Sequence, residues 1–545
     1  MLSGVRPYVL LGILCFLLYA PGLAAIPPLD RDEARFAQAT RQMLETGDFI
    51  RIRFQDEARN KKPIGIYWLQ AAAVASFSSP ESAAIWPYRL PSALAGAGAV
   101  LLTFAFGASL LGSRPAGFLA ALLTGSALGV VTEAHLATTD AALLAAVVAG
   151  QGALGLVYAA ARSGRSVSRS VPLVFWLAEA AAILLKGPPG PVLALLTVVA
   201  LSIADRDVRW VCGLRPRTGL LLTGLVVAPW FIAIEGATGG QFISDSVSRD
   251  LLPKLVGAQE AHGAPPGYYS ALVFATFWPG SLFIVPALLW GWRWRRALAA
   301  RFLLAWLVPG WLLLEFVPTK LPHYVLPLYP ALALLAGGAL SEGIARGFTG
   351  WARLFDGAVK LLWAGATLAF AVALIALPRW FGGEISAYVM AAALASLGAA
   401  VLLLRHRGPP MKVAGLTALL AGGIVLPAAL EVVPGLDGLW LSRSARLLLM
   451  RHRPGPGEAV LSVGYSEPSL VFLLGTKTRL VTAAPSADQL AGAGMGLVND
   501  RFSAEFRQSL ASHGLTMRAI ESVRGLDYSA GGEKLVLTLY RLERG

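Results

Sequence analysis

Cysteine and charged residues are both scarce in this sequence of 545 residues. The two cysteines are Cys15, in an apolar run, and Cys212, in a basic loop, and they supply no disulfide framework. Charged residues make up 14% of the chain, whereas soluble domains carry about 25%. Together with the 56% of hydrophobic residues, this deficit predicts an integral membrane protein.

Three kinds of motif are also missing. We find no glycine-rich phosphate loop, no Cys/His zinc motif and no internal repeat. The first absence argues against a nucleotide substrate, and the last argues against the many transporters that are built from repeats. The formal net charge of +14 does not indicate a nucleic-acid partner, because the cations cluster in short loops between apolar runs.

Apolar runs long enough to cross a bilayer recur from residue 8 to residue 433. They are unbroken rather than alternating, so we expect helices and not a β-barrel. The first run resembles a signal peptide, but the many later runs favour an uncleaved helix. We predict about thirteen transmembrane helices, at residues 8–26, 88–112, 115–133, 140–161, 171–185, 188–204, 218–235, 268–292, 301–317, 323–341, 359–378, 385–404 and 412–433.

Basic residues alternate from loop to loop. With the N-terminus inside, the even-numbered loops carry the arginines, for example Arg114, Arg162 and Arg209. This is the positive-inside pattern, so these loops are expected in the cytoplasm. The odd-numbered loops and the C-terminal segment then lie on the outer face.

The longest outer loop, residues 27–87, is densely charged. Within it, residues 32–45 have amphipathic helical spacing, and residues 63–77 are apolar but too short to cross, which predicts an interfacial helix. After residue 433 the composition changes. We therefore divide the chain into a transmembrane domain, residues 1–433, and a small outer α/β domain, residues 434–545.

Short patterns support the second domain. The strand-like pieces are residues 459–463, 479–481 and 535–540, and the amphipathic pieces are residues 487–493 and 502–513. Their alternation along the chain is typical of a mixed α/β structure.

The residues from Asp30 to Arg35 place three carboxylates and two guanidinium groups where the first helix leaves the membrane. One interpretation is structural, with Asp30 or Asp32 capping the helix that follows. The other is catalytic: a carboxylate tuned upward by apolar surroundings and downward by a neighbouring Arg takes a proton from an acceptor hydroxyl. Asp30 and Glu33 are candidates for supporting it.

Cations at the same level form a candidate anion site. Arg59, Lys61 and Lys62 precede the expected interfacial helix, and Lys186 and Lys320 each lie in an outward hairpin. Taken singly, such residues often only reach lipid head groups. Their gathering on one face predicts a site for the phosphate of a lipid-linked donor.

Two other positions are candidates with a structural alternative. Asp140 follows Thr139 at the start of the fourth apolar run. One of the two is expected to cap that helix, but carboxylates at membrane depth also tend to be functional. His262 lies in an outer loop, and the sequence does not display the about three protein ligands that Zn²⁺ needs.

Four motifs together carry a family resemblance. Residues 32–37 (DEARFA), 61–68 (KKPIGIYW), 139–140 (TD) and 320–327 (KLPHYVLP) resemble, in this order, motifs of the bacterial aminoarabinose transferases. These belong to the GT-C superfamily, which they share with the protein O-mannosyltransferases. The resemblance also extends to the first outer loop, the span count and the C-terminal domain.

The resemblance implies a reaction and a place. The family moves a sugar from a polyprenyl phosphate, usually undecaprenyl phosphate, to an acceptor on the periplasmic face of the bacterial inner membrane. In the aminoarabinose enzymes the acceptor is lipid A. By this resemblance Asp32 is the catalytic carboxylate, Asp140 is a second Asp of the active cavity, and Arg35, Lys62 and Tyr324 lie at the donor phosphate.

One departure from the family concerns a metal site. Lys61 stands where the aminoarabinose transferases have a Glu. In the family that Glu partners a metal-binding His, which His262 resembles, so we expect that no Zn²⁺ or Mg²⁺ is required. The extra cation favours an acidic or neutral sugar, such as galacturonic acid or a hexose, at least as much as a cationic amino sugar.

Three hypotheses follow from the sequence. The leading one is a glycosyltransferase that uses a polyprenyl-phosphate-linked sugar and acts on lipid A or another envelope glycan. The second is a related enzyme acting on protein Ser or Thr hydroxyls, and the third is a lipid or sugar transporter or flippase. We expect contacts with membrane lipids, no nucleic acid and a monomer.

Overall fold

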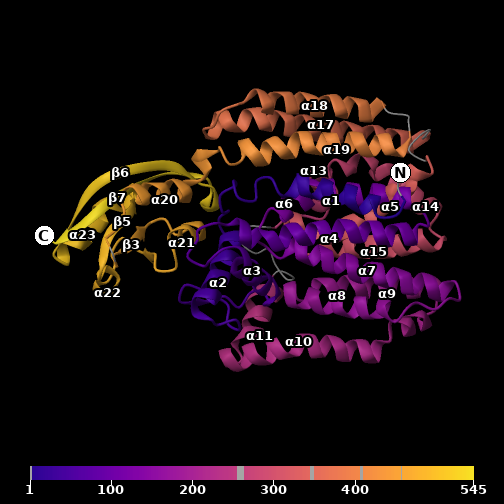
Figure 1. The fold of residues 1–545 in the computed structure, drawn as a ribbon, viewed down its shortest axis with the longest axis horizontal. Coiled ribbons are helices and arrows are strands. Elements are labelled where there is room, and N and C mark those ends of the chain that lie inside the picture. Colours follow the sequence, from indigo (N-terminus) through magenta and orange to yellow (C-terminus); the bar gives the residue numbers. More distant parts are fainter. Residues whose placement is uncertain (1–2, 254–262, 344–348, 406–408, 456, 545) are drawn as a thin grey trace.

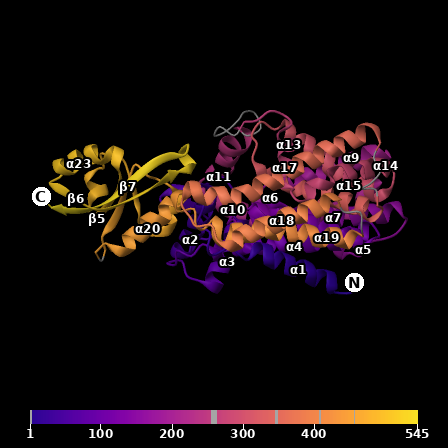
Figure 2. The same ribbon diagram turned by 90° about the horizontal axis from the view of Figure 1, so that it is seen from above.

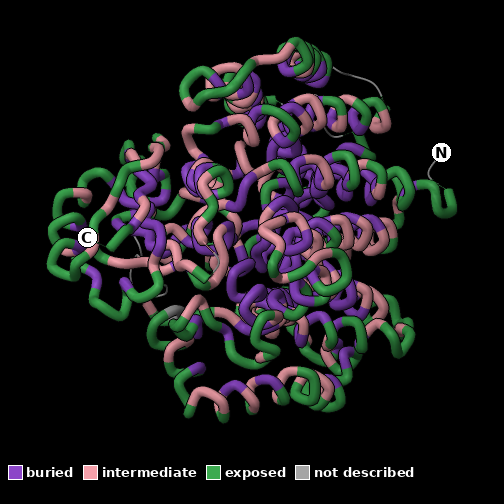
Figure 3. Tube along the Cα trace, turned by 60° about the vertical axis from the view of Figure 1, so that its left-hand side comes forward, coloured by how far each residue is buried: buried purple, intermediate pink, exposed green. Residues whose placement is uncertain are grey.

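The structure, a computed structural model, describes residues 3–253, 263–343, 349–405, 409–455 and 457–544. Long helices lie side by side over most of the chain, and a sheet lies at one end of them (Figure 1). Buried residues gather at the centre of the helical bundle, and exposed ones follow its outer helices (Figure 3). The expected helical architecture is confirmed.

The helices of the bundle coincide with the apolar runs of the sequence. They are α1 (Arg6–Tyr19), α4 (Trp86–Leu110), α5 (Arg114–Ser126), α6 (Leu128–Ala134), α7 (Asp140–Arg162), α8 (Ser170–Lys186), α9 (Pro189–Asp205), α10 (Pro216–Thr238), α13 (Tyr268–Thr276), α14 (Ile284–Arg293), α15 (Leu298–Phe316), α16 (Tyr329–Ser341), α17 (Gly350–Phe381), α18 (Ala387–Arg405) and α19 (Pro410–Pro427). Short helical turns extend or connect them: η1 (Arg209–Leu214), η3 (Gly280–Phe283), η4 (Pro322–Leu328) and η5 (Ala428–Val432).

Within the described residues, eight helices are long and apolar enough to cross a membrane, and two bent pairs raise the number to as many as ten. One pair joins α5 to α6 at 61°, and the other joins α13 to the helical stretch of η3 and α14 at 119°. The sequence predicts straight spans at residues 115–133 and 268–292, but both are broken. In the second, Pro279 stands at the break, where it cannot donate a helical hydrogen bond.

The other three expected spans coincide with shorter helices. α1, α8 and α9 contain 14, 17 and 17 residues, whereas a perpendicular crossing needs about 20. The apolar run predicts that the first helix continues to residue 26, but α1 ends at Tyr19 and turns follow around Pro21 and Gly22, whose φ is 88°. The number of thirteen spans therefore stays a prediction.

A mixed sheet with helices follows the bundle. Its elements are η6 (Asp437–Leu439), α20 (Leu441–Arg451), β3 (Ala459–Val463), α21 (Pro468–Leu474), β4 (Arg479–Val481), α22 (Ala487–Leu490), β5 (Ala493–Asn499), η7 (Asp500–Phe502), α23 (Ser503–Ser512), β6 (Leu515–Asp527), η8 (Tyr528–Ala530) and β7 (Glu533–Arg544). The strand order is β4-β3-β5-β7-β6. β3 runs parallel to β4 and β5, and β7 runs antiparallel to β5 and β6.

The strand-like pieces expected from the sequence coincide with β3, β4 and part of β7. Two strands were not expected. β5 contains Gly494 and Gly496, which strands generally disfavour. β6 lies at an edge of the sheet, and its charged residues weaken the hydrophobic signal that identifies a strand.

The outer loops lie at the end of the bundle that carries the sheet. Their elements are α2 (Asp32–Thr46), β1 (Arg53–Phe54), β2 (Glu57–Ala58), α3 (Gly65–Phe77), α11 (Gln241–Asp245) and η2 (Ser246–Leu251). In both ribbon views the N-terminus lies at the opposite end, away from the sheet (Figures 1 and 2). The N-terminus and the sheet thus lie at opposite ends of the bundle, and the side of the membrane that each one faces stays a prediction.

α2 is buried on almost every side. The sequence predicts one apolar face, and Phe36 and Met43 of that face are indeed buried. The polar face is covered as well, because Gln38 donates to Thr476 Oγ1 at 2.7 Å and Arg41 donates to the Phe472 carbonyl at 2.8 Å. The segment that contains α21 and the following loop therefore braces α2 from the outside.

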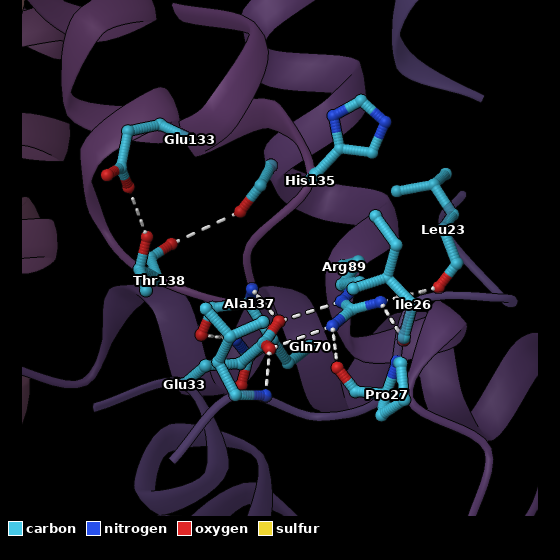
Figure 4. A network of polar contacts seen from close by, with 12 residues as sticks. Leu23, Ile26, Pro27, Glu33, Gln70, Arg89, Glu133, His135, Ala137 and Thr138 are labelled. Carbon is cyan, nitrogen blue, oxygen red and sulfur yellow. Dashed lines mark hydrogen bonds and ion pairs between the residues drawn. The ribbon is translucent and has the colours of Figure 1, made fainter. Parts of the chain in front are cut away.

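A buried ion pair anchors the start of α2 to the bundle. The Glu33 carboxylate accepts two hydrogen bonds from Arg89, at 2.7 and 2.8 Å. It also accepts hydrogen bonds from the Leu29 and Ala137 amides, at 2.8 and 2.9 Å. Figure 4 shows this network. The remaining Arg89 donors bond carbonyls of the segment after α1, those of Leu23, Ile26 and Pro27. The pair thus connects four segments of the chain.

Replacing one partner of this pair is expected to destabilise the protein strongly. Arg89→Met leaves the Glu33 carboxylate buried without a counter-charge, and such changes cost about 3–5 kcal/mol of unfolding free energy. Thermal unfolding in detergent measures the loss. A Glu33→Leu/Arg89→Met double variant should lose less than Arg89→Met alone, because no unpaired charge remains.

The exposed pair of Arg501 and Glu533 provides the control. Arg501→Met should cost about 1 kcal/mol or less, since exposed ion pairs contribute little. Equal effects at Arg89 and Arg501 would contradict the structural role of the buried pair.

Candidate active site

α2, which begins at Asp32, lies at the end of the bundle that carries the sheet. No side chain caps this helix, so the capping role expected for Asp30 or Asp32 is not observed. The Asp32 side chain is 65% exposed, and Arg59 donates to its Oδ1 at 3.3 Å. Arg59 itself is buried, with its guanidinium 5.1 Å from the centre of the Phe36 ring. A fixed cation therefore stands beside an accessible carboxylate.

Opposing effects set the pKa of Asp32. Desolvation by the surrounding protein raises it, but the charges of Arg59, Arg35 and Lys62 outweigh this effect and hold the pKa below its ordinary value. Asp32 is therefore ionised at neutral pH and ready to accept a proton.

A second carboxylate lies at the start of α7. The buried Asp140 accepts a bond from the ammonium group of Lys186, which ends α8. Thr139 occupies the N-cap position, but its hydroxyl donates to Asp140 Oδ2 at 3.3 Å instead of capping the helix. The Lys186 ammonium group also lies 5.1 Å from the centre of the Tyr324 ring. Three of the predicted residues are thus in contact.

His323 and Glu133 belong to the same cluster, although neither is among the site residues that the sequence predicts. His323 Nε2 lies 3.8 Å from Asp140 Oδ1, and its Nδ1 lies 3.6 Å from Glu133 Oε1. The other Glu133 oxygen accepts the Thr138 hydroxyl at 2.8 Å (Figure 4). The only signal in the sequence was their place within or beside the quoted motifs.

Lys62 and His323 connect the two halves of the site. The charge of Lys62 acts on both Asp32 and Asp140, and both carboxylates act on His323. The site is therefore one cluster, built from α2, the loop before α3 and the start of α3, the end of α6, the starts of α7 and η4, and the end of α8.

Two buried donors in the cluster have no hydrogen-bond partner of good geometry among the described residues. They are Nε of Arg59 and the hydroxyl of Tyr67, which lie beside each other. Burying such groups unpaired is unfavourable. Both atoms are closed off from the surface.

Lys320 has a different role from the one expected. Its ammonium group donates to the carbonyls of Leu314, Glu315 and Val317 at 2.9, 2.7 and 2.7 Å. Three bonds use all the donors of a lysine. Lys320 therefore caps the C-terminus of α15, and no donor remains for a phosphate.

The expected supporting residues divide between two roles. Glu33 is saturated by Arg89 and two amides, so it is structural. Asp30 faces the C-terminal segment, where its amide donates to the Tyr528 hydroxyl at 2.8 Å. Lys61 is exposed beside the cluster. Within the part of the chain that the structure describes, Lys186 alone of these four residues contacts another predicted site residue through its side chain.

The expected metal ligand, His262, lies outside the described residues. In the part of the chain that the structure describes, no group of three His, Cys, Asp or Glu side chains is arranged to hold a metal ion. The expectation that no metal is required stays a prediction.

Comparison with known proteins supports the family resemblance that the motifs predict. The family model for dolichyl-phosphate-mannose-protein mannosyltransferase matches residues 11–236. An undecaprenyl phosphate-alpha-4-amino-4-deoxy-L-arabinose arabinosyl transferase of Pseudomonas fluorescens is 27% identical over 64% of this chain and 62% of its own length. The corresponding protein of Pseudomonas aeruginosa is 27% identical over 61% of this chain and 60% of its own. The chain thus matches about three fifths of these relatives.

Solved structures show the same fold. The crystal structure of ArnT from Cupriavidus metallidurans bound to undecaprenyl phosphate matches with a TM-score of 0.73, 20% identity and 98% coverage of both chains. The resemblance predicted from the motifs is confirmed. An oligosaccharyltransferase of Archaeoglobus fulgidus has a more distant likeness, with a TM-score of 0.53, 12% identity, and coverage of 91% of this chain and 69% of that one. The chain therefore shares the fold of ArnT.

The lowered pKa of Asp32 depends on its neighbouring cations, and this can be measured directly. Arg59→Gln should raise the pKa of Asp32, so that the carboxylate becomes protonated at a higher pH than in the wild type. Infrared titration of the carboxyl band, with Asp32→Asn as the reference to subtract, reports the change. Arg51→Gln, at an exposed arginine of the same loop, is the control. An unchanged Asp32 titration in Arg59→Gln would contradict the assignment.

Proposed function

We propose that the protein is a glycosyltransferase that moves a sugar from undecaprenyl phosphate, or a related polyprenyl phosphate, to lipid A or another envelope glycan. The observation that carries this proposal is the ionised Asp32 held among Arg59, Arg35 and Lys62 at the outer end of a membrane bundle. The relatives named above, which bear the name of such a reaction, support it.

The cluster supplies the two effects that the reaction needs. An acceptor oxygen attacks the anomeric carbon while the bond from the sugar to the phosphate breaks, so negative charge grows on the leaving lipid phosphate. Arg59, Lys62 and Arg35 stabilise this charge. Asp32 accepts the proton of an acceptor hydroxyl.

The second half of the site holds the sugar in this proposal. Asp140 is fixed by Lys186 and approached by His323, so its free lone pairs accept bonds from sugar hydroxyls. Lys186 and Tyr324, which stack on each other, lie on the phosphate side. Lys61 favours an acidic or neutral sugar, whether a hexose or a pentose, at least as much as an amino sugar.

Two other hypotheses fit less well. A transporter places ionisable groups near the middle of the membrane, whereas the described cluster gathers at the start of α2, the start of α7 and the end of α8, toward the end of the bundle that carries the sheet (Figure 1). An enzyme acting on protein Ser or Thr hydroxyls uses the same chemistry at Asp32. The match to the mannosyltransferase model keeps it as the second candidate.

The arrangement in the cell follows from the charge pattern. We propose that the sheet end is periplasmic, that the bundle lies in the inner membrane, and that the chain divides at residue 434 into a transmembrane and a C-terminal domain. The exposed apolar side chains of α3, among them Trp68, Leu69 and Phe77, contact the membrane interface. The active unit is a monomer.

Asp32→Asn and Lys62→Ala should leave the protein folded in the membrane but abolish transfer, with losses of about 10²–10⁴-fold. The assay uses purified protein in lipid nanodiscs, a lipid A acceptor, and undecaprenyl-phosphate-linked aminoarabinose, galacturonic acid and hexose as separate donors. Asp56→Asn and Lys477→Ala change exposed charges outside the cluster and are the controls.

Full activity of Asp32→Asn and Lys62→Ala would contradict the proposal. Transfer to a peptide hydroxyl but not to lipid A would favour the second candidate. Mass spectrometry of lipid A and surface glycans from a deletion strain identifies the sugar and the acceptor that the cell uses.

A further inference from the structure

Arg31, the residue just before Asp32, has a strained backbone. Its φ is 65° and its ψ is −111°. Residues other than glycine rarely adopt such a backbone conformation, which persists only where surrounding contacts enforce it. Because Arg31 is the last residue before α2, its conformation sets the direction in which the helix starts. It therefore also sets the position of Asp32.

The contacts that enforce this conformation come from the other end of the chain. The Asp30 amide donates to the Tyr528 hydroxyl at 2.8 Å, and the Arg31 guanidinium donates to the Ser529 carbonyl. The Ser469 amide donates to Asp30 Oδ1 at 3.3 Å. Residues 30 and 31 are thus held by partners more than 400 positions later in the sequence.

The turn that supplies these partners is itself rigid. Asp527 Oδ1 accepts the Ala530 amide at 3.1 Å and the Ser529 hydroxyl at 3.0 Å. The turn η8 closes the hairpin of β6 and β7, whose ladder begins at the pair of Asp527 and Glu533. The Tyr528 ring also packs edge-on against Trp440 at 6.2 Å. A sheet of the C-terminal segment therefore fixes the position of the Tyr528 hydroxyl.

We propose that Tyr528 is a positioning residue for Asp32. With Ser529, it holds Arg31 in its positive-φ conformation, and this conformation orients the carboxylate that begins α2. The inference rests on the proposed function, in which Asp32 accepts a proton. It gives the C-terminal segment a part in the reaction although none of its residues touches the reacting atoms.

Docking of the C-terminal segment does not depend on Tyr528 alone. Gln38 bonds Thr476 at 2.7 Å, and Gln55 bonds the Thr478 carbonyl at 2.6 Å, both away from Arg31. Removing one hydroxyl should therefore leave the segment in place. The effect of Tyr528→Phe then reports on the start of α2 and not on loss of the whole contact.

Tyr528→Phe should lower kcat about tenfold and leave KM for the donor nearly unchanged, because a misplaced base affects the chemical step more than binding. The strain in the Arg31 backbone is tested by comparing two single variants of Arg31 that differ only in their freedom to adopt positive φ. Arg31→Gly and Arg31→Ala both lose the bond to Ser529, but only glycine adopts positive φ freely. The glycine variant should be about five- to tenfold more active than the alanine variant.

Hydrogen–deuterium exchange of the full-length protein in nanodiscs tests the inference without using activity. Tyr528→Phe should speed exchange of the peptide covering residues 29–36. Tyr540→Phe, which removes a hydroxyl of the same sheet that bonds no described residue, should not. Equal exchange in the two variants, or equal activity of the glycine and alanine variants, would overturn the inference. An inactive wild type would defeat the proposed function, while the exchange experiment would still decide whether Tyr528 holds Arg31.

Discussion

The buried pair of Glu33 and Arg89 is the interaction on which the rest of the site depends. A buried ion pair is tolerated only when its remaining donors and acceptors are bonded, and here all five Arg89 donors and both Glu33 oxygens are. The Ala137 amide joins the pair to the link that leads to Asp140. One ion pair thus fixes Asp32, the residue before Glu33, relative to the second carboxylate of the site.

Around this ion pair, the two carboxylates of the site have different partners: Asp32 pairs with Arg59, and Asp140 pairs with Lys186. Asp32 remains largely exposed beside buried Arg59, which suits a group that must meet a substrate. Asp140 is buried and bonded to Lys186, which suits a group that must stay in place. α2 carries the exposed carboxylate, and the C-terminal segment braces that helix on its polar side. The geometry of the reaction is therefore shared by the two parts of the chain.

Local patterns were enough to predict most of the helices and most of the residues that the cluster brings together, because hydropathy and charge are properties of short stretches. Contacts between distant residues were not predictable in this way. Lys320 was expected at a phosphate, but the path of the chain after α15 directs it onto helix carbonyls. His323 was missed because a lone histidine gives no signal until folding brings it to Glu133 and Asp140. The burial of the polar face of α2 was also not predictable, because the residues that cover it, Phe472 and Thr476, are distant in the sequence.

The most direct measurement is an electron-microscopy structure of the protein in lipid nanodiscs with undecaprenyl phosphate bound. The account predicts the phosphate within about 3 Å of Arg59 and Lys62, with Asp32 facing the position of the sugar. A phosphate bound at Lys320, or among the arginines at the opposite end of the bundle, would contradict it.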